Sequence, residues 1–207
     1  MEKVVVKTAV KTVLIILGIL IAVFAVFNFA FPQHMATATE SIGNYDLAVK
    51  YASLRYHYTK NCSDLARCFD DSVLAENDRY ILDYGEQLIS HRDYESVCES
   101  KNEKQTGSGY NYDQWVKGKL SVSYYNTGKP DKAIEKAEEA NGGGNTFVYG
   151  NALMSLSARV RKAEDRETAQ KLVNLLSDTE KFHPTETKEQ DYLRTVIQLL
   201  QDMINRQ

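Results

Sequence analysis

The chain has 207 residues, of which 43% are hydrophobic and 26% are charged, and its formal net charge is −3 at pH 7. This length corresponds to one or two compact domains, and the hydrophobic content is too high for a disordered chain. A charge so close to neutral argues against a nucleic-acid partner, because proteins that bind nucleic acid usually present a strongly basic face. The mean hydropathy of −0.42 argues against a protein with many membrane spans.

One very apolar segment lies near the N-terminus. Residues 12–31 read TVLIILGILIAVFAVFNFAF and contain no charged side chain. A helix of this length, at about 1.5 Å per residue, extends over about 30 Å, which is the thickness of the hydrocarbon core of a bilayer. Pro32 follows and favours an end or a kink of the helix. We therefore predict a transmembrane helix over residues 12–32 that contacts the lipid bilayer through residues 12–31.

The charges on either side of this segment indicate its orientation. Lys3, Lys7 and Lys11 precede it, whereas no Lys or Arg follows it before Lys50. The positive-inside rule therefore predicts that residues 1–11 form a cytoplasmic tail and that the rest of the chain lies outside the cytoplasm. A cleavable signal peptide is the alternative, because Ala36-Thr37-Ala38 resembles a cleavage site with small residues.

Three cysteines, Cys62, Cys68 and Cys98, follow the apolar segment. Outside the cytoplasm two of them could form a disulfide. Cys62 and Cys68 are six positions apart and do not share a face of one continuous helix, so a bond between them needs a helix break, and Cys98 could instead pair with either. Buried reduced thiols are the alternative. The cysteines could also bind zinc together with His57 or His91, but the sequence contains no compact zinc-ligand motif, so we expect no metal.

The chain beyond Pro32 has a helical pattern and no convincing strand pattern. Turn signals divide it into helical stretches, and the clearest are Gly43-Asn44, residues 101–113, Gly128-Lys129-Pro130, Gly142-Gly143-Gly144 and His183-Pro184. We therefore predict an all-α protein.

A short pattern recurs at the start of four of these helical stretches. An acidic residue is followed two positions later by a small apolar residue, at Ala48, Val97, Ala133 and Ala169, with spacings of 49, 36 and 36. An acid in the first turn is favoured by the helix dipole, and a small side chain allows a neighbouring helix to approach closely. Such a spacing predicts repeated helix pairs.

The strongest copy of the repeat, Trp115 to Ala140, resembles a tetratricopeptide repeat. Leu120, Tyr124, Ala133, Ala137 and Ala140 stand where two packed helices need apolar or small residues. The segments 81–104 and 153–176 align with it, so the resemblance covers residues 74–182 and implies a solenoid of antiparallel helix hairpins.

The sequence departs from the repeat pattern in the unit at 81–104. The unit at 81–104 carries Lys101 and Lys104 where its second helix should be apolar, so we expect that helix to be short. Residues 33–73 are interpreted as a membrane-proximal helical segment, either a degenerate first repeat or a stalk. An irregular helical bundle is the alternative to the whole solenoid.

The last segment, residues 183–207, predicts a helix that closes the solenoid. Thr187 and Gln190 form a capping-box pattern. Apolar residues then recur on one face, at Leu193, Val196, Ile197, Leu200, Met203 and Ile204. A terminal helix with a polar outer face suits the end of a solenoid, and a helix that forms a homo-oligomer would have the same pattern.

No catalytic motif is present in the sequence. Gly142-Gly143-Gly144-Asn145 lacks the Lys-Ser/Thr of a phosphate-binding loop, and the four histidines form no His-Glu-x-x-His pair. We therefore expect a protein that is not an enzyme, has no catalytic residues and needs no cofactor.

The resemblance to tetratricopeptide repeats implies a groove lined by the first helix of each pair, in which peptides bind. Carried onto this chain, that layout places in the groove Arg79, Leu82, Glu86 and Ile89, then Trp115, Val122, Tyr125 and Asn126, then Asn151, Met154, Ala158 and Arg161. Trp, Tyr, Met and Arg are residue types that binding interfaces favour, although the same aromatic rings could belong to the core.

The sequence therefore predicts a membrane-anchored, noncatalytic module that binds a protein or peptide outside the cytoplasm. A structural subunit of a membrane complex is one alternative. A redox enzyme or sensor built on one of the thiols is the other.

Overall fold

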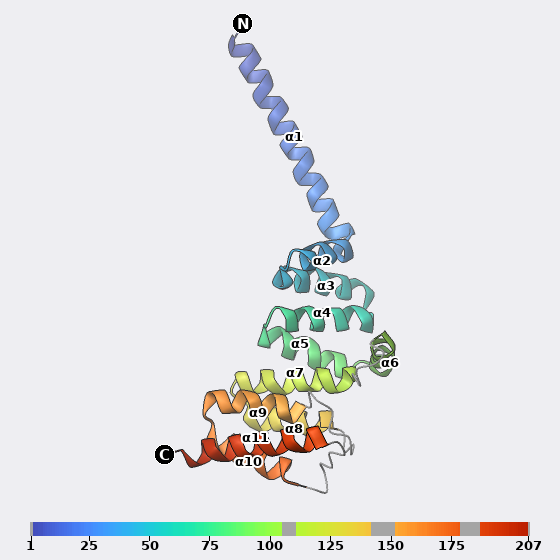
Figure 1. Cartoon of the computed structure of the whole chain (residues 1–207). Helices are drawn as coiled ribbons and strands as arrows, with labels where there is room; N and C mark the ends of the chain where they lie inside the picture. The colour runs from blue at the N-terminus through green and yellow to red at the C-terminus, as the bar shows by residue number, and fades with distance from the viewer. Residues whose placement is uncertain (1, 105–110, 142–151, 179–186, 207) are drawn as a thin grey trace. The chain divides into compact units, whose positions relative to one another are not determined.

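The computed structural model describes residues 2–104, 111–141, 152–178 and 187–206, and these residues form eleven helices and no strand (Figure 1). The prediction of an all-α protein is therefore confirmed for the described part of the chain. The chain divides into two compact units, Met1–Ala75 and Glu76–Gln207, and each is described by itself.

The first unit begins with the long helix α1, Glu2–Ala30. Its window Val10–Phe27 has a mean hydropathy of 2.8, and none of that window is buried against the rest of the protein. This helix is therefore long and apolar enough to cross a membrane. It starts well before residue 12, so the expected N-terminal tail is helical from Glu2. Pro32 is the first residue of the next helix, α2 (Pro32–Ser41), because proline fits a first helical position but cannot continue a helix.

Two more helices complete the first unit. Helix α3 spans Tyr45–Thr59 and α4 spans Cys62–Leu74, and α3 packs against both α2 and α4. The predicted turn before α3 is confirmed, since Gly43 has φ +74° and the Asn44 side chain accepts a hydrogen bond from the Leu47 N–H.

A charged cluster joins α4 to α2 within this unit. The Arg67 guanidinium lies 2.6 Å from the Glu40 carboxylate and also donates to the Thr37 hydroxyl at 2.8 Å. Asp71, which is 3% exposed, lies 4.0 Å from the same guanidinium. Burial and the neighbouring Glu40 carboxylate raise the pKa of Asp71 to about 7, against the opposing effect of Arg67.

The second unit holds the remaining helices. They are α5 (Asp78–Ile89), α6 (Tyr94–Lys104), α7 (Tyr112–Asn126), α8 (Pro130–Asn141), α9 (Ala152–Ala163), α10 (Arg166–Leu176) and α11 (Thr187–Asn205). The predicted turn between α7 and α8 is confirmed by Gly128 at φ +77° and by Pro130 at the start of α8. The turn signals at 142–144 and 183–184 lie outside the described residues.

Helices α7 to α11 pack in succession on one continuous core. Helix α7 contacts α8 and α9, α9 contacts α8, α10 and α11, and α10 contacts α11. The Ser121 hydroxyl of α7 donates to the Ala133 carbonyl of α8 at 2.7 Å. A Cβ placed on Gly118 of α7 would lie 3.4 Å from the Ala152 Cβ of α9, which is van der Waals contact, so the two helices are closely packed at this point.

Helices α7 and α9 run in the same direction. Gly118 of α7 meets Ala152 at the start of α9, and Asn126 at the end of α7 accepts a hydrogen bond from Arg159 farther along α9. Helix α5 runs against them, because Asp78 at its start bonds to Asn126 at the end of α7 (Figure 1).

The segment from α5 to α6 differs from the hairpin predicted for 81–104. Helix α5 packs directly against α7, and α6 packs against α7 instead of pairing with α5. The reason lies in α6, which buries Val97 and Cys98 and carries Lys101 and charged neighbours over its last turns. It has no apolar stripe long enough to hold a second helix along its length.

Candidate functional site

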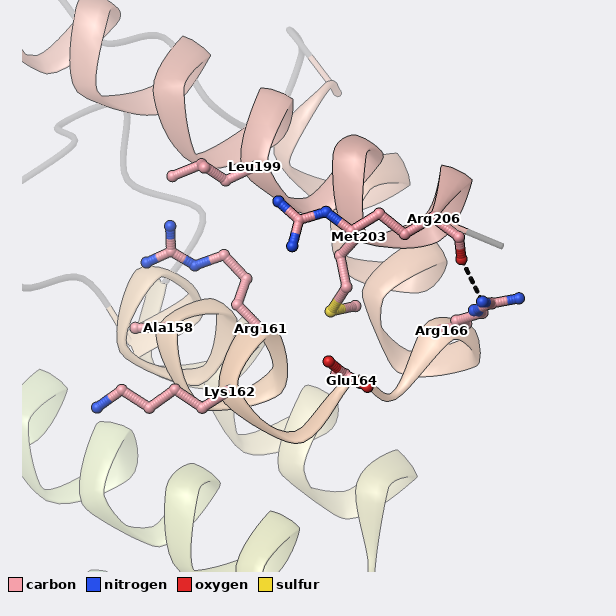
Figure 2. A pocket seen from close by; sticks show the side chains of 8 residues that line it. All are labelled: Ala158, Arg161, Lys162, Glu164, Arg166, Leu199, Met203 and Arg206. Carbon is pink, nitrogen blue, oxygen red and sulfur yellow. Dashed lines mark hydrogen bonds between the residues drawn. The ribbon is translucent and has the colours of Figure 1, made fainter.

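A pocket of about 630 Å³ lies in the second unit between α9 and α11. Its lining combines four basic side chains, one acidic side chain and three apolar ones. They are Ala158, Arg161, Lys162, Glu164, Arg166, Leu199, Met203 and Arg206 (Figure 2).

Helical spacing aligns these side chains along two helices. Ala158 and Arg161 are three positions apart on α9, so they lie on one face. Leu199 and Met203 are four positions apart on α11, and Arg206 follows three positions later. Helix α11 is held in place by the buried side chains of Leu193, Val196, Leu200 and Met203, which leaves Leu199 40% exposed beside the pocket.

The turn between α9 and α10 closes one end of the pocket. Glu164 has φ +57°, and the next residue, Asp165, caps α10 by accepting from the Thr168 N–H at 3.1 Å and from its hydroxyl at 2.7 Å. Burial opposes the charge on Asp165, but the hydrogen bonds from Thr168 and Tyr125 outweigh it and lower the pKa of this carboxyl. This turn directs Arg166 to α11, where its guanidinium donates to the Arg206 carbonyl.

Four basic side chains against one acidic side chain give the described lining of the pocket a net positive charge. The Arg161 Nε is buried and has no hydrogen-bond partner in the part of the chain that the structure describes. Arg161 and Arg206 direct their guanidinium groups toward the Leu199 side, whereas Lys162 extends away from Met203 (Figure 2). None of the ion pairs found among described residues involves Arg161, Lys162 or Arg206.

The chemistry of the lining favours holding an anion. Guanidinium groups donate paired hydrogen bonds to carboxylates and phosphates, and the neighbouring apolar side chains would contact an apolar group. The lining residues named above include no histidine, cysteine or hydroxyl side chain. Among the described residues, no three His, Cys, Asp or Glu side chains gather in a way that could hold a metal ion.

The groove residues predicted on α5 lie elsewhere and serve other contacts. Arg79 is exposed and lies 3.9 Å from Asp83 of its own helix. The Glu86 carboxylate accepts a hydrogen bond from the Tyr124 hydroxyl at 2.8 Å and lies 3.7 Å from the Lys136 ammonium. Glu86 thus links α5 to α7 and α8.

The groove residues predicted on α7 are half-buried or bonded to neighbouring helices. The Trp115 ring stacks on the Tyr112 ring, with centroids 5.5 Å apart, and Val122 is half-buried. Burial and a hydrogen bond to Asp165 raise the pKa of Tyr125 to about 12. The Asn126 amide donates to both Asp78 carboxylate oxygens, at 3.0 and 3.1 Å, and accepts from the Arg159 Nε at 2.7 Å.

On α9 the predicted residues divide between the core and the pocket. Met154 is 3% exposed and belongs to the core, so it offers no groove surface. Arg161 lines the pocket, and Asn151 lies outside the described residues. The sequence assigned no site role to the other charged lining residues or to the residues of α11, which are Lys162, Glu164, Arg166, Leu199, Met203 and Arg206. Leu199 could have been noticed as a leucine placed outside the apolar stripe of its helix.

The three cysteines are buried thiols. Cys62 and Cys68 lie on α4 and Cys98 lies on α6. Burial, followed by the nearby Asp71 carboxylate, raises the pKa of Cys68 to about 12. Burial also raises the pKa of Cys98, although the Tyr94 hydroxyl opposes this shift. Thiols in such surroundings stay protonated at neutral pH and are poor nucleophiles.

Comparisons with protein-family models, with curated proteins and with solved structures found no match.

Proposed function

We propose that this protein is a membrane-anchored, noncatalytic interaction module that binds a protein or peptide partner outside the cytoplasm. The pocket between α9 and α11 carries the proposal. It brings guanidinium groups that have no ion pair among the described residues next to the exposed side chain of Leu199, and a surface of this composition is better suited to binding than to chemistry.

The packing of the second unit supports a tetratricopeptide-like arrangement for α7 to α11. The pairs α7–α8 and α9–α10 are each followed by a helix that contacts both members of the pair. In this proposal α7, α9 and α11 form the binding face and α11 closes the stack. Helices α5 and α6 are an addition to it and not a further repeat.

The exposed apolar surface of helix α1 supports the proposal that the chain is anchored in a membrane. Its exposed large side chains, among them Leu14, Ile15 and Leu20, have no partner surface in the first unit, and lipid would cover them. The lysines that precede them support a cytoplasmic N-terminus.

Labelling of one new thiol tests this orientation, because the native cysteines are buried. Gln201 is exposed on α11, so Gln201→Cys should react with a membrane-impermeant maleimide in intact cells. Lys7→Cys, in the N-terminal segment, should react only after permeabilisation. The reverse pattern would contradict the proposed orientation.

A photo-crosslinking amino acid at Leu199 tests the binding face in the full chain in its native membrane. We expect a dominant crosslinked partner at position 199 and none at Gln170, an exposed residue of α10. Arg161→Gln should weaken the crosslink several-fold. Equal capture at both positions would contradict the proposed face.

A structural subunit is the second candidate, because α11 also exposes Tyr192, which is 37% accessible. Capture of a second copy alone at position 199 would favour that role. The thiol-based alternative is disfavoured by the raised pKa of Cys68 and Cys98, and it would require activity that is lost in Cys98→Ser.

A further inference from the structure

We propose that the pocket between α9 and α11 binds an acidic segment of a partner polypeptide in which an Asp or Glu side chain stands next to a large apolar one. This inference rests on the proposed function and adds the chemical class of the partner.

The charge of the pocket contrasts with that of the unit around it. Residues 76–207 contain 18 basic and 22 acidic side chains, which gives a formal charge of −4. The pocket concentrates four basic side chains and one acidic one in the same unit. A local excess of positive charge in an acidic unit is complementary to an anionic ligand and not to the unit's own surface.

Arg161 is the group that the ligand would satisfy. Its Nε is removed from solvent and makes no hydrogen bond within the described chain. A buried donor without an acceptor is unfavourable, and a ligand carboxylate that accepts two hydrogen bonds from the terminal nitrogens of the same guanidinium would offset that cost with its negative charge. Arg206 directs its guanidinium toward the same side of the pocket (Figure 2).

The apolar side chains determine what stands next to the acid. Leu199 is 40% exposed and Met203 9% exposed on the α11 side, and Ala158 leaves the α9 side open because its side chain is short. A volume of about 630 Å³ has room for a few side chains of an extended segment. An apolar residue adjacent to the acid would cover Leu199.

A polypeptide fits these features better than a lipid headgroup. A phosphate group would use the guanidinium groups but would leave Leu199 uncovered. An acidic segment with an adjacent apolar residue would contact both the guanidinium groups and Leu199.

Peptide binding to the full-length chain in nanodiscs of zwitterionic lipid tests the proposal. The probe is a fluorescein-labelled, end-blocked peptide with the sequence Gly-Asp-Glu-Leu-Glu-Phe-Asp-Gly, and the matched control peptide has Asn and Gln in place of its acids. We expect the acidic peptide to bind at least about tenfold more tightly, and we expect Arg161→Gln and Arg206→Gln each to weaken it about tenfold. Leu199→Ser should weaken it about threefold.

The control variant is Arg194→Gln. It removes an exposed arginine of α11 that does not line the pocket. It should leave peptide affinity unchanged, and the fluorescence of the single tryptophan, Trp115, reports whether each variant is folded. Equal binding of the amide peptide, or equal losses in Arg194→Gln and Arg161→Gln, would overturn the proposal. Slower hydrogen exchange of the pocket residues in phosphatidylserine nanodiscs without any peptide would also overturn the proposal, because that result would assign the pocket to a lipid headgroup.

The outcomes separate this inference from the proposed function. If Leu199 crosslinks a partner in the native membrane while the acidic peptide does not bind, the interaction module stands and the acidic ligand is wrong. If neither experiment gives binding, both proposals are wrong.

Discussion

Helices α8 and α6 have similar lengths and begin with the same acidic signal, yet they pack differently. Helix α8 buries Ala133, Ala137 and Ala140 completely or almost completely, and it contacts both α7 and α9. Helix α6 buries Val97 and Cys98 and contacts α7. A first-turn acid therefore favours a helix, whereas a continuous stripe of small residues allows that helix to pack between two others.

The largest effect should come from the core that α9 shares with its neighbours. Leu156 is fully buried, so Leu156→Ala should lower the free energy of unfolding by about 2–5 kcal/mol. Urea unfolding of the full chain in detergent micelles, followed by Trp115 fluorescence, measures it. The matched control is Leu199→Ala, which removes the same atoms from a side chain that is 40% exposed and should cost about 0.5 kcal/mol. Similar losses in both variants would show that α9 is not packed as described.

The second prediction compares α8 and α6 directly. Ala137 is fully buried between helices, so Ala137→Leu should overpack the stack and cost about 1–3 kcal/mol. Ser100 is exposed on α6, and Ser100→Leu should change the free energy of unfolding by no more than about 0.5 kcal/mol. The same unfolding assay measures both variants, and a cost at Ser100 equal to that at Ala137 would remove the distinction between the two helices.

The third prediction concerns how α6 is attached. The Tyr94 hydroxyl donates to the Asp113 carboxylate at 3.0 Å, whereas Asp113 also has an ion pair with Lys117 at 2.8 Å. Tyr94→Phe should lower the local stability of α6 by about 0.5–1.5 kcal/mol and leave α8 unchanged. Hydrogen exchange measures both helices, with Tyr58→Phe, at a 65% exposed position, as the control. Equal destabilisation of α8 would mean that α6 belongs to the stack.

The smallest effect concerns the link between α5 and α7 and depends on pH. Burial, reinforced by the hydrogen bond to Glu86, raises the pKa of Tyr124 to about 12 from its model-compound value of 10.0. The unfolded chain therefore loses this proton first, and the stabilisation, present below pH 10, is lost as pH rises toward 12. Tyr124→Phe should make this decline shallower, by no more than about 1 kcal/mol, because the hydrogen bond to Glu86 is only partly buried. Urea midpoints measured across this pH range would contradict the assignment if both proteins declined in parallel.

Much of the fold could be predicted from local signals. The apolar run up to Phe31, the glycine turn at Gly128 and the small residues of α8 each specify their own structure through chemistry within a few positions. The antiparallel contact of α5 with α7 could not be predicted in this way. It depends on Asp78 meeting Asn126 and on Glu86 meeting Tyr124, and these pairs are far apart in sequence.

The candidate site could be predicted only in part, because some of its residues are brought together by contacts between helices that are far apart in sequence. Arg161, predicted for the groove, lines the pocket, whereas Met154, predicted for the same groove, is buried in the core. The other half of the pocket comes from α11. The exposure of Leu199 there follows from how α11 is rotated on α9 and α10, which is a property of tertiary packing.

Helices α7 to α11 pack in succession on one core beside the pocket, and α6 contacts α7 outside that succession. Hydrogen exchange of the full-length chain in nanodiscs, resolved by helix, tests this arrangement most directly. We expect the amides of α7, α8 and α9 to exchange together through one cooperative opening, and those of α6 to exchange earlier by local opening. Exchange of α6 and α8 with the same protection, or exchange of α8 well before α7, would contradict the account.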